Sequence, residues 1–169
     1  MTEAVSRQRW RPLAAAGLLL GAGLGGFVDG IVLHQILQLH NMLSAILPTN
    51  NVVDLKVNMF WDGIFHAGVW GMTVLGVLLL FRAGRNASVV WSGRALCGFS
   101  LIGWGTFNLV EGVINHHLLV LHHVVDAAAN PFPADLAFLL SGLLLIGIGG
   151  GLVWQAQLAH AGKARSLPR

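Results

Sequence analysis

The chain has 169 residues, of which 55% are hydrophobic and only 10% are charged, and its mean hydropathy is +0.70. A water-soluble domain of this size needs far more charge to cover its surface, so the composition excludes an ordinary soluble protein and predicts a membrane protein. The pI near 10 accompanies a net charge of only +3, which lipid headgroups explain better than a nucleic-acid partner. The single cysteine, Cys97, excludes an intramolecular disulfide framework.

Four apolar runs follow a polar arm at residues 1–12, and each is long enough to span a membrane, which takes roughly 20 apolar residues. A signal peptide is a rival interpretation of the first run, but the run continues past the usual length of such a segment. The link 127–135 contains Pro131 and Pro133, which favour an extended turn. We predict a membrane domain at 13–156, with spans at about 13–39, 59–81, 95–117 and 136–155, and a tail at 157–169.

The basic residues predict the orientation of the chain. Nine of the ten lie in the N-terminal arm, between the second and third spans, or in the C-terminal tail, and only Lys56 lies on the other side. The positive-inside rule then places both termini in the cytoplasm. The nine residues are Arg7, Arg9, Arg11, Arg82, Arg85, Arg94, Lys163, Arg165 and Arg169.

An internal repeat relates the ends of the first and third spans. The segment DGIVLHQILQLHN at 29–41 aligns without a gap with EGVINHHLLVLHH at 111–123. This alignment places Asp29 on Glu111, His34 on His116 and His40 on His122. The sequence therefore predicts an all-α, integral membrane four-helix bundle made of two repeated helix pairs.

Small residues suit close packing of these helices. Gly17, Gly21 and Gly25 recur every four residues in the first span, and Gly103 lies in the third. Such residues let helix backbones approach each other in lipid. The fourth span carries Gly142, Gly147, Gly149, Gly150 and Gly151. A phosphate-binding loop is not expected there, because no strand precedes these glycines and no Lys-Ser/Thr follows them.

Acidic and histidine side chains of three spans fall at one level of the predicted bundle. Spans one and three run outward and end in the repeated motif, whereas span two runs inward and begins with WDGIFH at 61–66. Intramembrane charges cost about 3 kcal/mol or more on an isolated helix, so they normally face the bundle interior and find partners. We expect Asp29, His34, Asp62, His66, Glu111 and His116 to converge in the outer part of the bundle. We expect His40, His117, His122 and His123 at or above the outer interface, where they are either ligands or solvated surface groups.

The helical spacing predicts how these groups share an ion. Asp62 and His66 are four residues apart and lie on one face of a helix. Asp29 and His34 are five residues apart, which separates them by about 140° around an α-helix. The equivalent pair in the third span has the same spacing. These two pairs are poor chelators alone, so we predict ligation shared among helices.

The donor types restrict the cofactor. Imidazole suits zinc, copper and iron, and the absence of cysteine ligands argues against an iron–sulfur cluster or a soft copper(I) trafficking site. Two or three histidines with one carboxylate suit copper(II) or zinc, and a carboxylate-rich set suits a dinuclear iron site. Haem is a weaker candidate, because the histidines of each motif are too close for two stacked haems. Met42 and Met59 remain candidates if the ion is copper(I).

Three motifs carry a resemblance to a known family. The segments GFVDGIVLHQILQLHNMLS at 26–44, WDGIFHA at 61–67 and NLVEGVINHHLLVLHHV at 108–124 resemble the bacterial membrane proteins of domain-of-unknown-function family 2243, over about residues 13–155. The resemblance implies a four-span plasma-membrane protein with no established activity, encoded near functions in copper-oxidase assembly, and it places copper ahead of zinc and iron. Asn41 departs from the family, since many relatives have the second histidine of a His-His pair there.

Three functions from different classes follow. The first is a metal-binding protein, most plausibly for copper, that acts in metal handling or in respiratory oxidase assembly. The second is a metal-dependent membrane oxidoreductase, and the third is an accessory structural subunit whose acids and histidines satisfy one another. A proton relay through Asp62, His66 and Glu111 is a further option. The expected partners are the lipid bilayer and a respiratory or other metal-dependent membrane complex, a homo-oligomer is also open, and no nucleic acid is expected.

Overall fold

The computed structural model describes residues 3–166, with side chains described from Arg9 to Lys163, so the side chains of Arg7, Arg165 and Arg169 lie outside the described residues. It confirms an all-helical protein, and residues 3–166 contain no strand. The α-helices are α1 (Glu3–Val28), α2 (Val52–Gly84), α3 (Gly93–Glu111) and α4 (Phe132–Ser166). Two π-helical segments, η1 (Asp29–Ile36) and η2 (Gly112–Leu118), continue α1 and α3.

All four helices are long and apolar enough to cross a membrane. The candidate spans are Arg9–Ile36, Val52–Gly84, Gly93–Leu118 and Phe132–Lys163. Asn51 begins α2, because its side chain accepts the backbone N–H groups of Val53 and Asp54, both at 3.0 Å. The prediction of an extended link at 127–135 is wrong from Phe132 onward. Pro133 lies in the first turn of α4, where a helix tolerates proline because the N–H has no intrahelical partner.

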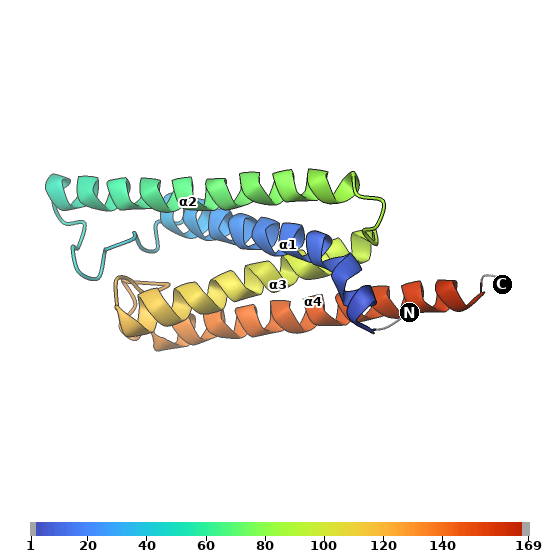
Figure 1. The fold of residues 1–169 in the computed structure, drawn as a ribbon. Coiled ribbons are helices and arrows are strands. Elements are labelled where there is room, and N and C mark those ends of the chain that lie inside the picture. Colours follow the sequence, from blue (N-terminus) through green and yellow to red (C-terminus); the bar gives the residue numbers. More distant parts are fainter. Residues whose placement is uncertain (1–2, 167–169) are drawn as a thin grey trace.

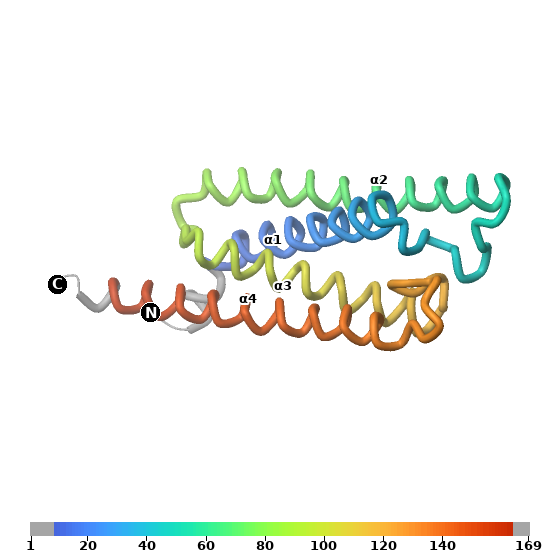
Figure 2. Tube along the Cα trace, turned by 180° about the vertical axis from the view of Figure 1, so that it is seen from behind, coloured from blue at the N-terminus to red at the C-terminus, as the bar shows by residue number. Residues whose placement is uncertain are grey.

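The central pair of helices is α1 and α3, and α2 and α4 flank this pair on opposite sides (Figure 1; seen from behind in Figure 2). Helix α1 packs against α2 and α3, and α3 also packs against α4. In the most apolar window of each span, 44% of α1 and 33% of α3 is buried, against 11% of α2 and of α4. The flanking helices therefore present most of their surface to lipid.

Two glycines let the central helices touch through their backbones. A Cβ atom on Gly21 would collide with the Ser100 carbonyl, and one on Gly103 would collide with the Leu18 carbonyl. Both contacts follow the offset of the sequence repeat, because residues 21 and 103, like residues 18 and 100, are 82 positions apart. The other small residues divide: Gly17, Gly25, Gly142 and Gly149 face a neighbouring helix closely, whereas Gly147, Gly150 and Gly151 face open space.

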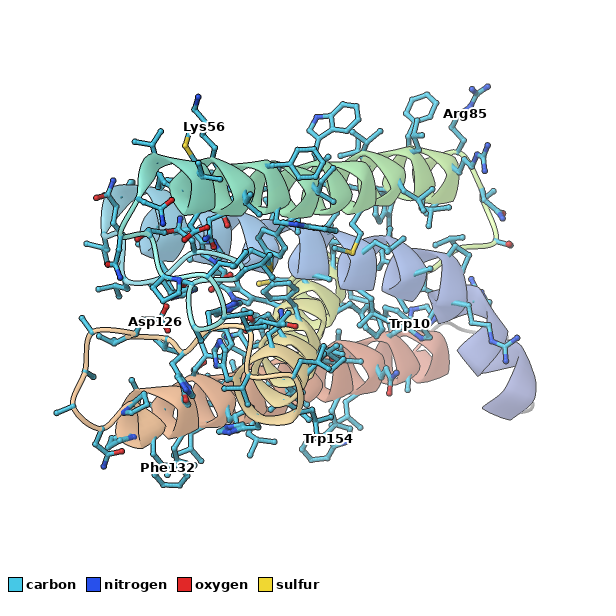
Figure 3. All side chains as sticks on the ribbon, turned by 90° about the vertical axis from the view of Figure 1, so that its left-hand side faces the viewer. Trp10, Lys56, Arg85, Asp126, Phe132 and Trp154 are labelled. Atoms are coloured by element: carbon cyan, nitrogen blue, oxygen red, sulfur yellow. The ribbon has the colours of Figure 1, made fainter. Side chains whose placement is uncertain are left out.

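The two ends of the bundle differ in chemistry. The connection 85–92, the start of α1 and the end of α4 lie at one end of the bundle (Figure 1). The connections 37–51 and 119–131 lie at the other end, which we call the loop end. Figure 3 shows Arg85 and Lys56 near opposite ends of α2. The acid and histidine motifs occupy the loop end, together with Lys56.

Candidate metal centre

Eight ionisable side chains are buried together at the loop end of the central helices. Each is at most 5% exposed, so their mutual contacts decide their chemistry. Buried ionisable groups without compensating partners are costly in any protein interior. The eight are Asp29, His34, His40, Asp62, Glu111, His116, His122 and Asp135.

The π-helical segments bring each acid onto the histidine five residues later. A π-helix bonds residue i to residue i + 5, so side chains five residues apart lie nearly on one face. Oδ2 of Asp29 lies 3.3 Å from Nε2 of His34, and Oε1 of Glu111 lies 3.3 Å from Nε2 of His116. The prediction that such pairs are separated by about 140°, which assumed an α-helix, is therefore wrong in both motifs.

A left-handed residue follows each π-helical segment. Gln38 has φ 50° and Val120, 82 residues later, has φ 49°. Non-glycine residues in this region are uncommon and cost about 1 kcal/mol or more, which points to a functional constraint. The histidine two residues later, His40 or His122, then lies in the interior at 3% or 0% exposed. Of the two alternatives for these rings, the one in which they are solvated surface groups is therefore wrong.

The rings of His40 and His122 are held by each other's loops. Nδ1 of His40 donates to the carbonyl of Val124 at 3.0 Å, and Nδ1 of His122 donates to the carbonyl of Met42 at 3.0 Å. Because a carbonyl only accepts, each Nδ1 carries a proton, and Nε2 is the ring nitrogen left to bind a further partner. A hydrogen bond of this kind sets the tautomer of a metal-binding histidine.

Carboxylates from the flanking helices face the other two rings. Nδ1 of His34 lies 3.0 Å from Oδ1 of Asp62 on α2, and Nδ1 of His116 lies 3.5 Å from Oδ1 of Asp135 on α4. When Nδ1 of each ring carries the proton and points it at that carboxylate, the Nε2 lone pair faces Asp29 in the first motif and Glu111 in the second. Carboxylate–histidine–metal triads have this arrangement, with the outer carboxylate orienting the ligand.

The same two outer carboxylates are themselves oriented in matching ways. Asn41 donates from Nδ2 to Oδ2 of Asp62 at 2.8 Å, and His123 donates from Nδ1 to Oδ2 of Asp135 at 2.7 Å. Asn41 and His123 are equivalent in the repeat. An amide thus makes at position 41 the contact that an imidazole makes at position 123, so neither side chain is needed there as a ligand.

Six polar atoms in the centre are buried without a hydrogen-bond partner among the described residues. Buried polar atoms without a partner are rare in folded proteins, and a bound ion or water is one physical reason for them. When Nδ1 carries the proton, Nε2 of His34 and Oδ2 of Asp29 face each other as two lone pairs, which repel unless a cation or a second proton lies with them. The six atoms are Asp29 Oδ2, His34 Nε2, His40 Nε2, Glu111 Oε2, His116 Nδ1 and His116 Nε2.

His40 lies outside the four candidate spans, in the connection 37–51. Burial lowers its pKa to about 3, because the interior disfavours imidazolium, and positive charge on His122 or His34 acts in the same direction. His40 is therefore neutral near pH 7. Neutral imidazole is the form that binds metal ions.

The structure brings six of the ten predicted ligands together and places the other four around them. Two sets of donor atoms lie within 4.8 Å of one another: His34 with His40 and His122, and Glu111 with His116 and His122. Asp29 belongs to neither set, but its Oδ2 lies 3.3 Å from Nε2 of His34. Metal ligation by these groups stays a prediction.

The remaining four predicted ligands have other surroundings. Asp62 and His123 orient inner groups, as described above. His66 is half-buried with Nδ1 2.6 Å from the Asp62 carbonyl, beside a cavity of about 390 Å³ that Met59 also lines. His117 is exposed.

Sequence reasoning missed Asp135, which contacts both His116 and His123. The signal that could have identified Asp135 is its position directly before an apolar run. Asp135 was instead assigned to the segment predicted to be an extended link. Asp126 was missed too. Its Oδ1 accepts the backbone N–H of His123 at 2.8 Å, and its Oδ2 is buried with no partner among the described residues.

A cavity of about 490 Å³ opens at the loop end and reaches His40. Its lining combines polar residues of both connections, including Asn41, Ser44, His123 and Asp126. Figure 3 shows Asp126 on the connection that faces the viewer. This cavity gives ions and small polar molecules access to the edge of the buried centre.

Comparison with known proteins agrees with the membrane architecture. A family model described as "Predicted membrane protein (DUF2243)" matches residues 16–156. No curated protein and no solved structure matches the chain. With four candidate spans and a match over most of its length, the chain belongs to the family of predicted membrane proteins DUF2243.

Proposed function

We propose that this membrane protein binds transition-metal ions among the four buried histidines at its loop end. The observation that carries the proposal is the pairing of ring nitrogens with carboxylate oxygens at 3.3 Å in both motifs. In each pair, Nδ1 of the histidine faces a second carboxylate, on Asp62 or Asp135. A proton on Nδ1 then leaves the lone pair on Nε2. A cation between the paired lone pairs removes their repulsion and satisfies the orphaned atoms.

The donor set favours a borderline metal ion. Imidazole with carboxylate suits Cu²⁺, Zn²⁺ and Fe²⁺, and a set of two histidines with one carboxylate is also found in non-haem iron sites. We place Cu²⁺ first, because it binds nitrogen-rich sites more tightly than the other divalent first-row ions. The proposed role is copper handling, either on its own or during assembly of a respiratory oxidase.

The proposed side of action is the outer face of a bacterial plasma membrane. The basic residues Arg82, Arg85, Arg94 and Lys163 belong to the end of the bundle opposite the histidines. The positive-inside rule places that end in the cytoplasm. The centre then lies near the outer surface, and the loop-end cavity opens away from the cytoplasm.

A metal-free structural layer is the second candidate. It is favoured by the direct contact of His122 Nε2 with Glu111 Oε1 at 2.9 Å, which a protonated ring also makes. In that case His34 and His116 each hold two protons between two carboxylates. This alternative leaves His40 Nε2, which is neutral and buried, with no partner among the described residues.

A metal-dependent oxidoreductase is the third candidate. The cavity of about 490 Å³ beside His40 is the observation that favours it, because a small substrate has room to approach the centre there. Redox turnover with small electron donors would separate this activity from storage or delivery of the ion.

The test is metal binding by the purified full-length protein in mild detergent. After exposure to equal concentrations of Cu²⁺, Zn²⁺ and Fe²⁺ and removal of free ions, we expect bound copper in excess of zinc and iron by elemental analysis. His160→Ala is the control, since His160 packs on Trp10 at the opposite end. A folded protein that retains no metal would overturn the site, whereas retention of zinc or iron over copper would overturn only the choice of metal.

A further inference from the structure

The arrangement of the histidine rings bears on how many ions the centre holds. We propose that it holds two ions, one for each motif, and not one ion shared by both; this rests on the proposed metal-binding function. The first ion takes ligands from Asp29, His34 and His40. The second takes ligands from Glu111, His116 and His122.

Ring orientation carries the argument. An imidazole lone pair lies in the plane of its ring, so a bound ion lies close to that plane. The rings of His40 and His122 are stacked, with an interplanar angle of 3° and centroids 4.5 Å apart. Two stacked, parallel rings have separate planes, and one ion cannot lie in both. His40 and His122 therefore serve different ions.

The rings within one motif have the opposite relation. His34 and His40 are inclined at 69° with centroids 4.3 Å apart, and His116 and His122 are inclined at 71° with centroids 5.0 Å apart. Inclined planes intersect, so one ion can lie in both. The cross-motif pairs are also inclined, but their centroids are farther apart, at 5.6 Å for His34 with His122 and 6.3 Å for His40 with His116. Each ion is thus shared within a motif.

The exchanged loop contacts support the same assignment. His40 is fixed through Nδ1 to a carbonyl of the second half, and His122 is fixed through Nδ1 to a carbonyl of the first half. The opposite edge of each ring is then free for its own motif. In the second motif this is direct, because His122 Nε2 lies 2.9 Å from Oε1 of Glu111.

Charge balance also favours two ions. The four carboxylates of Asp29, Asp62, Glu111 and Asp135 are at most 5% exposed, and their ion pairs are with histidines. Two divalent ions match the charge of all four carboxylates, whereas a single ion matches only two of them.

The test counts ions on the purified full-length protein and examines their coupling. With Cu²⁺ as the probe, we expect two ions per chain and an electron paramagnetic resonance spectrum of magnetically coupled copper. His40→Ala and His122→Ala should each retain one ion and give the spectrum of isolated Cu²⁺. His117→Ala, at an exposed position in the same motif, should retain two coupled ions.

Each outcome is informative. One ion per wild-type chain, or loss of all copper in both single variants, overturns the paired centre but leaves the proposed metal-binding function standing. No copper on folded wild-type protein overturns both. If a variant fails to fold, as judged by circular dichroism and size-exclusion chromatography, the count and spectrum of the wild-type protein decide the question alone.

Discussion

The molecule has two halves: α1, η1 and α2 form the first, and α3, η2 and α4 form the second. The two halves share the contacts among the buried acids and histidines, and they differ in the residues around those groups. Each half places an acid on the histidine five residues later and fixes a second histidine, six residues after the first, to the opposite loop. The outer positions change: Asn41 corresponds to His123, and Ser44 corresponds to Asp126. The contacts that recur are those a bound ion requires, whereas the surroundings vary.

The carboxylates of Asp62 and Asp135, which orient His34 and His116, do not follow the 82-residue offset of the repeat. Asp62 and Asp135 are 73 residues apart rather than 82, yet they contact equivalent rings. Asp62 lies ten residues after the start of α2, and Asp135 lies three residues after the start of α4. The difference of seven residues is about two helical turns, which keeps both acids on the inward face. Helix α2 correspondingly extends farther beyond the centre than α4 (Figure 1).

The largest effect is expected from removing these outer carboxylates. Asp62→Asn should weaken metal binding in the first half by about 10- to 100-fold, because His34 loses the anionic acceptor that orients its ring. Asp135→Asn should act likewise on the second half. Titration against a competing chelator measures both affinities. Asp54→Asn is the control, since Asp54 bonds Asn51 at the start of α2, and equal affinities in all three variants would refute the orienting role.

A smaller effect is expected from making the cavity alike in both halves. Asp126→Ser installs the residue found at the equivalent position 44, whose hydroxyl also accepts a backbone N–H. The variant removes one negative charge from the lining of the loop-end cavity. We expect metal association to slow by roughly three- to tenfold through loss of electrostatic attraction, with an unchanged final stoichiometry. Stopped-flow mixing measures the rate, and an unchanged rate would mean that ions reach the centre by another path.

The smallest effect is expected from Asn41→His, which gives both halves the same residue. The new imidazole should donate to Asp62 as His123 donates to Asp135. Affinity should then stay within about twofold of wild type, since the contact with the carboxylate is kept. An additional bound ion in this variant, detected by elemental analysis, would show instead that a histidine at this position is itself a ligand.

Much of the architecture could be read from local patterns. Apolar runs predicted the four helices, and small residues predicted close packing at Gly21 and Gly103. The burial of His40 and His122 could not be read, because an α-helical projection carries no information about the π-helical segments or the left-handed residues at 38 and 120. Asp135 was missed because two prolines indicated a turn, although proline fits the first turn of a helix equally well.

Hydrophobicity and spacing by themselves determined that the chain crosses a membrane and carries a twice-repeated set of acids and histidines, since both are properties of contiguous segments. Only the tertiary structure decided which nitrogen of His40 and of His122 is turned toward the acids and histidines of the centre. That depends on the carbonyls of Met42 and Val124, which reach the opposite half only when α1 and α3 pack together. The close backbone contact at Gly21 and Gly103 sets this approach, and so it places the two motifs face to face.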